Sequence, residues 1–328
     1  MNQKNVLVTG ANGYIGNAVA KAFSRAGWKV YGLIRRPELA RELARQEIFP
    51  VVGSPENLTF MAQISDVAFD VIVSNTEDRH DAAGHLAKVR TMMDALVASS
   101  EALGVRSLVM FSSGCKDYGR MSEKHGDPAL APHSENSPIN PPDVLIPRSN
   151  LCSNLLNKRQ TPFDVVILRP TIVYGHSSSY YGALFCLAAN SQGTLSLMAD
   201  PNAVMHACHV DDCAEAYVML AEHPDRSQVA NQVFNISNAR YETARQIGEA
   251  LARSYGLALQ FVFPEQGKVE NFNSAHGLTN FWQWVGSDKI RRVTGWQTRR
   301  PSFVQGMEQY RLAYEATLVG DDNGAPGV

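Results

Sequence analysis

Short apolar runs alternate with longer helix-forming stretches along most of the chain. The apolar runs are typical of strands buried on both faces of a parallel sheet. They lie at residues 6–8, 29–34, 49–52, 69–73, 107–111, 163–168 and 233–236. The helical stretches lie at 18–24, 38–46, 85–103, 151–158, 183–190, 213–222, 244–254 and 303–315. Because strands and helices alternate, the pattern predicts an α/β fold with a doubly wound parallel sheet.

The alternation breaks after Gly175, and this break predicts two units. We expect residues 1–175 to form the sheet domain, with residues 209–240 returning to it. Residues 176–328 are then expected to form a smaller C-terminal α/β lobe, and 320–328 a frayed terminus.

Glycines follow the first apolar run directly and stand at the start of a helix. Gly10 permits a tight turn, Gly13 lets the backbone approach a pyrophosphate, and Gly16 lets the helix pack on the strand. The N–H groups at the helix start then bind the phosphates. The alternative is a plain tight turn, but strand, turn and helix together predict a Rossmann-type dinucleotide site. Its expected contacts are Gly10, Asn12, Gly13, Tyr14, Ile15 and Gly16.

The second strand ends in Arg35 and Arg36, with no carboxylate nearer than Glu38. A carboxylate at this place accepts hydrogen bonds from a ribose 2′-hydroxyl, whereas arginine accommodates a 2′-phosphate. We therefore expect NADP(H) as the cofactor; the alternative is a solvated basic turn. Ser112 and Pro170, at the ends of two later strands, complete the predicted cofactor site.

Composition and charge narrow the class of protein. The net charge of -2 gives no basic excess for nucleic acid or an anionic membrane, and no apolar run approaches the ~20 residues that span a bilayer. The polar N-terminus lacks the pattern of a signal peptide. The five cysteines are odd in number and scattered, which favours a reducing compartment and predicts a cytoplasmic protein. No metal is expected, because His206, Cys208, His209 and Cys213 lack paired ligand spacing.

Several further motifs occur in an order that resembles one family over nearly the whole chain. They are the glycine turn from Thr9, Ser112-Ser113 with Tyr118-Gly119, Arg169-Pro170 with Val173-Tyr174-Gly175, His209-Val210-Asp211-Asp212, Phe234-Asn235-Ile236 and Gly295-Trp296. The chain resembles the extended short-chain dehydrogenase/reductase superfamily, of the epimerase/dehydratase type. The resemblance implies a Rossmann domain that carries a nicotinamide nucleotide, and a smaller lobe that closes over a carbonyl or hydroxyl substrate. A homodimer is also implied, because this superfamily often dimerises.

The chain departs from this family at the catalytic positions. The family uses a Tyr-x-x-x-Lys pair as acid/base, and these positions fall on Ile146 and Asn150. The assisting serine falls on Gly114. We therefore expect the usual catalytic groups to be absent.

A second, partial resemblance suggests other catalytic residues. Residues 28–37 and 114–118 resemble segments of the progesterone 5β-reductase/iridoid synthase family, which prefers NADPH and reduces conjugated enones. Its functional lysine maps onto Lys116, which we expect to polarise a substrate oxygen. The alternative is a lysine on a surface loop.

Four other residues are candidates for proton transfer or hydrogen bonding. Ser113 and Tyr118 follow the fifth strand, and His176 and Tyr181, with Tyr180 between them, follow the sixth. Each has packing or turn formation as the alternative role. His133, Glu135 and Arg148 lie where the missing pair belongs, and the Arg148 guanidinium either anchors a substrate carboxylate or forms an exposed ion pair.

Taken together, the sequence predicts an NADP(H)-dependent reductase with non-standard catalytic residues. We expect it to act on a small carbonyl or enone compound, in secondary metabolism. Two alternatives remain open: a non-redox isomerase, cyclase or dehydratase on the same fold, and a nucleotide-sensing regulator that binds a partner protein.

Overall fold

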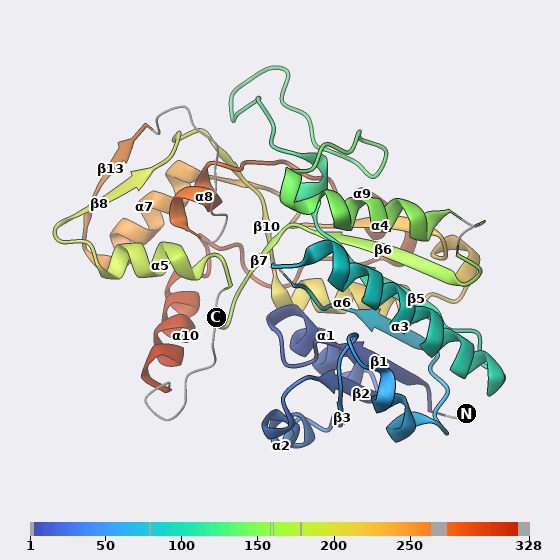
Figure 1. Ribbon diagram of the computed structural model, residues 1–328. Coiled ribbons are helices and arrows are strands. Elements are labelled where there is room, and N and C mark those ends of the chain that lie inside the picture. Colours follow the sequence, from blue (N-terminus) through green and yellow to red (C-terminus); the bar gives the residue numbers. More distant parts are fainter. Residues whose placement is uncertain are drawn as a thin grey trace.

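A seven-stranded parallel sheet forms the centre of the molecule (Figure 1). The structure is a computed structural model, and the description covers residues 3–78, 80–157, 159, 161–177, 179–263 and 274–320. The strand order is β11-β6-β5-β4-β1-β2-β3, and every neighbouring pair is parallel. The strands are β1 (Asn5–Thr9), β2 (Lys29–Ile34), β3 (Phe49–Val52), β4 (Val71–Ser74), β5 (Leu108–Ser112), β6 (Asp164–Pro170) and β11 (Gln232–Ile236).

Helices cover both faces of this sheet, which is why its strands are apolar runs. Val6 and Val8 of β1 pack in one core, with α1 (Tyr14–Arg25), α2 (Ala40–Arg45) and α6 (Val210–Ala221). Leu7, between them, points to the other face, where it packs with α3 (Ala82–Ala102) and α4 (Ile146–Leu156). Short 3-10 helices join these elements: η1 (Pro37–Leu39), η2 (Leu58–Ile64), η3 (Cys115–Tyr118), η4 (Asp143–Leu145) and η5 (Arg226–Gln228).

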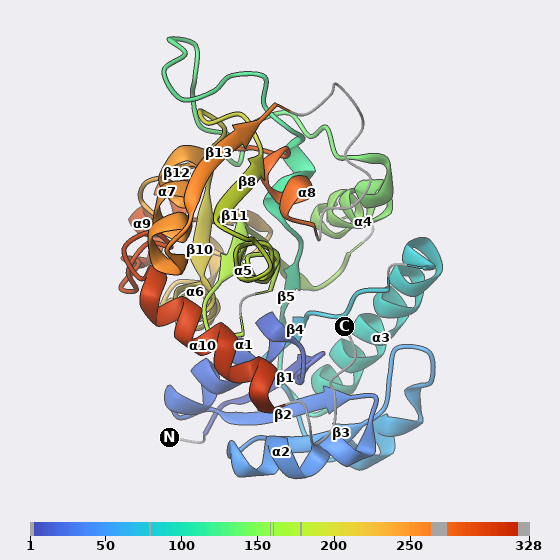
Figure 2. The same cartoon turned by 90° about the vertical axis from the view of Figure 1, so that its left-hand side faces the viewer.

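The C-terminal lobe has its own core beside the sheet (Figure 2). Its parallel pair of strands is β8 (Thr194–Met198) with β13 (Ala258–Val262). Around this pair lie α5 (Gly182–Ala189), α7 (Ala244–Tyr255), α8 (Ala275–Thr279) and α10 (Met307–Gly320). Two short pairs, β7 (Ile172–Tyr174) with β10 (Ala207–His209) and β9 (Val204–Met205) with β12 (Glu242–Thr243), complete the strands of this half. The predicted fold class is confirmed.

The chain returns twice from this half of the sequence to the sheet. The first return is α6 followed by β11: α6 packs in the core with β1, and β11 pairs with β6 at the edge of the sheet. The second return was not predicted: α9 (Asp288–Thr294) and the residues after it place Ile290 and Trp296 in the core beneath β1. The boundary at residue 175 remains a prediction, but residues 288–296 pack with the sheet domain.

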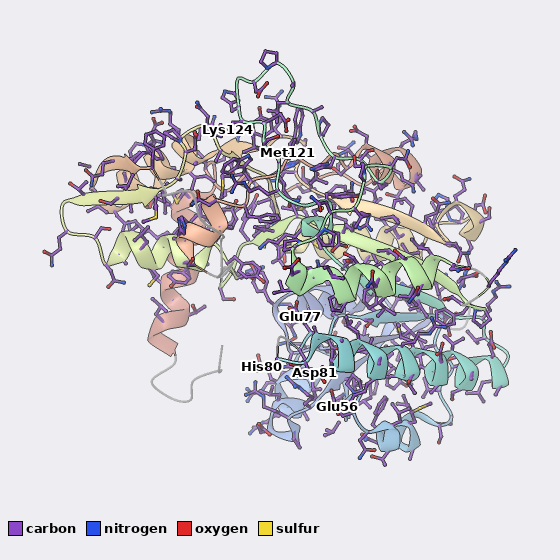
Figure 3. The ribbon with its side chains drawn as sticks, turned by 45° about the horizontal axis from the view of Figure 1, so that its top comes forward. Glu56, Glu77, His80, Asp81, Met121 and Lys124 are labelled. Atoms are coloured by element: carbon purple, nitrogen blue, oxygen red, sulfur yellow. The ribbon has the colours of Figure 1, made fainter. Side chains whose placement is uncertain are left out.

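The segment between η3 and η4 projects from the top of the molecule in Figures 1 and 2. Hydrogen bonds and an ion pair tie its base to the C-terminal lobe. Lys124 pairs with Asp200 at 2.6 Å, and the Trp284 N–H donates to the Met121 sulfur at 3.1 Å. Figure 3 labels Met121 and Lys124 at this base.

The predicted helices exist with shifted ends. The long helix expected from His85 begins at Ala82, where the Asp81 carboxylate caps it, and the helix expected from Phe303 begins at Met307. Lys158, predicted to end a helix, and residues 321–328, predicted to belong to a frayed terminus, lie outside the described residues. Within the described ranges, no helix has the length and apolar character that a bilayer crossing requires.

Candidate functional site

The glycine turn after β1 has the geometry that its sequence predicts. Gly10 has φ +63°, and a Cβ there would lie 2.9 Å from the Asn75 carbonyl oxygen. A Cβ on Gly16 would lie only 2.1 Å from the Gly10 carbonyl oxygen. The turn therefore requires glycine at both positions, one for its backbone conformation and one for its close packing.

The start of α1 offers hydrogen-bond donors to an anion. Gly13 is the N-cap, and α1 has neither a capping side chain nor an acidic residue in its first turn, where Tyr14, Ile15 and Gly16 lie. The helix dipole adds partial positive charge at this end. Such a helix start suits a phosphate.

A cavity of about 410 Å³ opens beside this helix start. Asn12, Gly13 and Tyr14 line one part of it, and Arg36 lies in its wall together with Lys21. Arg35 is exposed and is not among the lining residues described. Of the two arginines predicted to contact a 2′-phosphate, the structure brings only Arg36 to the cavity.

The ends of β4 and β5 add polar groups. Ser112 Oγ contacts Asn75 Oδ1, and it lies 2.7 Å from the Tyr217 hydroxyl. The Asn75 Nδ2 is buried and has no hydrogen-bond partner in the described part of the chain. Pro170 ends β6 at the same edge of the sheet. An open helix start, a lining guanidinium and an unpaired amide together fit a nicotinamide dinucleotide.

The usual catalytic positions hold no acid/base pair. Ile146 and Asn150, both exposed, lie on α4 at the tyrosine and lysine positions. Gly114 stands at the serine position, and the Arg148 guanidinium takes the space beside it, 3.4 Å from where a Cβ would lie. The tyrosine, lysine and serine of the family are therefore missing here, and Arg148 lies next to the end of β5.

A buried carboxylate holds this region together. Asp117 is fully buried and accepts from Arg148 at 2.9 Å, from Arg169 at 3.3 Å and from the Ser113 hydroxyl at 2.5 Å. Burial alone would lower the pKa of Arg148, but the charge and hydrogen bond of Asp117 raise it above the usual range. Both guanidiniums are therefore charged, and Ser113 is occupied as a donor inside the network.

Tyr118 is placed as a structural residue. Its hydroxyl donates to Asn235 at 2.8 Å and accepts from Arg169 at 3.1 Å, and its ring stacks on His133 with centroids 5.2 Å apart. Burial raises the pKa of Tyr118 to about 12. A phenol that is enclosed and hard to ionise is poorly suited to proton transfer near neutral pH.

Lys116 lies on η3, just after β5, and is half-buried. Its Nζ is 5.2 Å from the ring centroid of Tyr180 and 5.4 Å from that of Phe281, both from the second half of the chain. The two rings shield the ammonium group from water, which strengthens its effect on a nearby negative charge. The predicted lysine thus lies where the C-terminal lobe meets the sheet.

His176 and Tyr181 lie in different surroundings, one exposed and the other buried. His176 is exposed, has φ +47°, and its Nε2 lies 3.0 Å from Asp211. Tyr181 is fully buried against Tyr174 and Phe303, and burial raises its pKa well above the usual range. The position of Tyr181 suits packing of the lobe rather than proton donation.

His176, His209 and Asp211 bring three potential metal ligands within 4.8 Å of one another. Arg300 also forms an ion pair with Asp211, and His209 Nδ1 accepts from the Asp211 N–H at 3.0 Å. Although burial acts to raise it, hydrogen bonding to His176 and the charges nearby hold the pKa of Asp211 well below its usual range. An arginine already balances this carboxylate.

The sequence did not predict the acidic and imidazole groups on the loop after β4. Figure 3 shows Glu77 near the start of α4, and His80 and Asp81 near the start of α3. His85 Nδ1 lies 3.2 Å from Glu56, and its Nε2 lies 3.1 Å from Thr76. No spacing in the sequence links His85, on α3, to Glu56, because Glu56 belongs to the connection after β3, 29 residues earlier.

Solved structures share this fold over almost their full length. A dTDP-glucose 4,6-dehydratase from Bacillus anthracis str. Ames, in complex with NAD, aligns with a TM-score of 0.75 and 16% identity, over 95% of this chain and 97% of that one. A UDP-glucose 4-epimerase from Thermotoga maritima, with UDP-glucose, gives 0.73 and 20%, over 96% and 99%. A short-chain dehydrogenase/reductase superfamily protein from Agrobacterium tumefaciens, with bound NAD, gives 0.68 and 19%, over 97% and 99%.

Comparison at the level of sequence gives the family. No curated protein matches the chain. The model of the NAD dependent epimerase/dehydratase family matches residues 6–237, from β1 to the residue after β11. The match covers more than half of the chain and includes the glycine turn, the end of β5 and the β11 return. The chain therefore belongs to the NAD dependent epimerase/dehydratase family, as the resemblance of its motifs to the epimerase/dehydratase type predicts.

Proposed function

We propose that this protein is an NADP(H)-dependent reductase that acts on a small carbonyl or enone compound. The observation that carries the proposal is the position of Lys116, a half-buried cation just after β5, under two aromatic rings of the second half of the chain. In this fold the reacting end of the cofactor binds at the carboxyl ends of the strands. A cofactor of this class supplies a hydride when bound.

Lys116 acts on the substrate oxygen in this proposal. Its ammonium group donates a hydrogen bond to the carbonyl oxygen and stabilises the negative charge that develops there as the carbon accepts hydride. The oxygen or the α-carbon then takes a proton, from the ammonium group or from water, which gives the reduced product. His176, exposed at the edge of the cofactor cavity, is a second donor candidate.

NADPH preference rests on Arg36. Its guanidinium lies in the cavity wall near the start of α1, where it is placed to bind a ribose 2′-phosphate. Glu38 lies 4.0 Å from it, so the charge of Arg36 is only loosely balanced. A cytoplasmic location and a role in secondary metabolism belong to the same proposal.

Fluorescence titration of NADPH and NADH tests the cofactor assignment. We expect Arg36→Ala to weaken NADPH binding by about tenfold or more and to leave NADH nearly unchanged. Arg35→Ala is the matched control, because Arg35 does not line the cavity. Equal losses in both variants, or equal binding of NADPH and NADH by the wild type, would contradict it.

A substrate panel tests the reaction. The wild type should oxidise NADPH with some aldehydes, ketones or enones, and Lys116→Met should lower kcat by about a hundredfold. Lys124→Met, on the projecting segment, is the matched control and should keep the wild-type rate. NADPH binding without turnover of any member of the panel argues against the reductase.

A non-redox reaction is the second candidate. The absence of the family's acid/base groups at Ile146, Asn150 and Gly114 favours it, because these groups serve reversible oxidation of a hydroxyl. An isomerase, cyclase or dehydratase would form product with no net consumption of NADPH. Mass spectrometry of the product beside the absorbance of NADPH distinguishes the two.

A further inference from the structure

The backbone conformation at Gly114 does not require a glycine. Its φ of −173° and ψ of 156° are an extended conformation that any residue adopts. The nearest atoms that a Cβ at this position would meet are those of the Arg148 guanidinium, with Nη2 at 3.4 Å and Nη1 at 3.7 Å. The missing side chain therefore leaves room over the terminal edge of that guanidinium.

Arg148 shares its buried carboxylate partner with a second guanidinium. Asp117, which is fully buried, is shared between Arg148 and Arg169, and the side chain of Arg169 is only 6% exposed. One buried carboxylate thus accepts hydrogen bonds from two guanidiniums. Arg148 also stands in the first turn of α4, which has no acidic residue there, so the helix dipole adds to the positive potential.

Arg148 is partly accessible and has more N–H donors than its hydrogen bond to Asp117 uses. A guanidinium carries five N–H groups. The NH2 group donates to Asp117, while Nε is buried with no hydrogen-bond partner in the described ranges, and the side chain is 20% exposed. Beside Asp117, the Glu77 carboxylate acts on the pKa of Arg148 and also raises it. Figure 3 shows Glu77 near the start of α4.

We propose that Arg148 determines substrate specificity by binding a carboxylate of the substrate over Gly114. This inference rests on the proposed reductase function, because Lys116 follows Gly114 by two residues on the same turn. The substrate class is then a carbonyl or enone compound that carries a carboxylate near its reducible group. The planar fork of arginine suits a carboxylate, which binds through two parallel hydrogen bonds.

The substitution Arg148→Met tests this directly, because the network keeps its other members. Asp117 would still accept from Arg169 and Ser113, so the variant is expected to fold. Two enone probes are compared by calorimetry in the presence of NADP+, which occupies the cofactor site but supplies no hydride: trans-3-benzoylacrylate and its methyl ester. The wild type should bind the acid about tenfold or more tightly than the ester.

The ratio of acid to ester affinity is the readout. It should fall to about one in Arg148→Met and to an intermediate value in Arg148→Lys, which keeps the charge but not the fork. Arg106→Met is the matched control: this arginine, 67% exposed and paired with Asp164, lies just before β5, at the opposite edge of the sheet. It should keep the wild-type ratio.

A second variant tests the space over Gly114 and leaves Arg148 unsubstituted. Gly114→Ser places a hydroxyl within reach of the guanidinium and should lower the ratio by competing with the carboxylate. A ratio near one in the wild type, or an undiminished ratio in Arg148→Met, overturns the inference and leaves Arg148 as a structural ion pair. Assay of the same samples with NADPH and the panel of aldehydes, ketones and enones separates this outcome from failure of the reductase proposal, in which no member of the panel is reduced.

Discussion

Replacing Asp117 with asparagine removes the one carboxylate that two buried guanidiniums share. Asp117 is 0% exposed, and the Arg169 side chain, at 6%, cannot turn to water. Breaking a buried ion pair by removing one partner costs about 3–5 kcal/mol, because the remaining charge is left uncompensated. Arg148, at 20% exposure, is partly relieved by solvent, so we expect Asp117→Asn to lose about 3–5 kcal/mol rather than twice that amount.

Urea unfolding followed by circular dichroism measures this loss as a shift of the midpoint at constant slope. Asp94→Asn is the matched control, since it removes the same charge from a carboxylate that is 47% exposed and pairs with Arg90, four residues before it on α3. That pair contributes about 0.3–0.5 kcal/mol. A loss below about 1 kcal/mol for Asp117→Asn would refute the view that the network depends on its carboxylate.

Three further predictions concern other parts of the chain. Gly16→Ala drives a Cβ to 2.1 Å from a backbone oxygen, so thermal unfolding should show a loss of at least about 1–3 kcal/mol, together with loss of NADPH binding. Burial lowers the pKa of both His206 and His209 to about 4, so the unfolded chain binds more protons between pH 6.5 and 4, and stability falls as pH falls through this window. Each contributes about 2 kcal/mol of loss between pH 7 and 5, and an unfolding free energy that stays flat there would contradict this. Tyr14→Phe removes a 2.6 Å hydrogen bond to the Gly175 carbonyl and should cost about 1 kcal/mol in the same unfolding assay.

The sheet could be predicted because a strand buried on both faces appears in the sequence as a continuous apolar run. β1 and β6 are buried over all or nearly all of their length, and the apolar residues at their centres were found as runs. β8 and β13 were missed, because their side chains alternate between buried or half-buried and exposed, and they pair with each other outside the main sheet. A short strand of this kind differs little from a loop in its composition.

The site was predictable in its local parts and not in its long-range ones. The positive φ of Gly10 and the close contact of Gly16 with the Gly10 carbonyl are local constraints, so the spacing of these glycines alone indicates their roles. Tyr118 was identified as a polar group at the end of β5, but its partners Asn235 and Arg169 come from far along the chain. Asp117 meets an arginine 31 residues away and another 52 residues away, and no local pattern joins such residues.

The double return of the chain to the sheet limits how this protein can be divided. β6 pairs with β11, so a fragment that ends at residue 175 would expose the edge of β6 along its whole length. The same fragment would lack Trp296, a fully buried side chain of the core beneath β1. A single cut in the chain therefore cannot separate the lobe from the sheet domain, and the lobe cannot be exchanged at one point. Any exchange between relatives has to carry β11 and residues 288–296 along with the sheet, since these segments belong to it in space although they lie far from it in sequence.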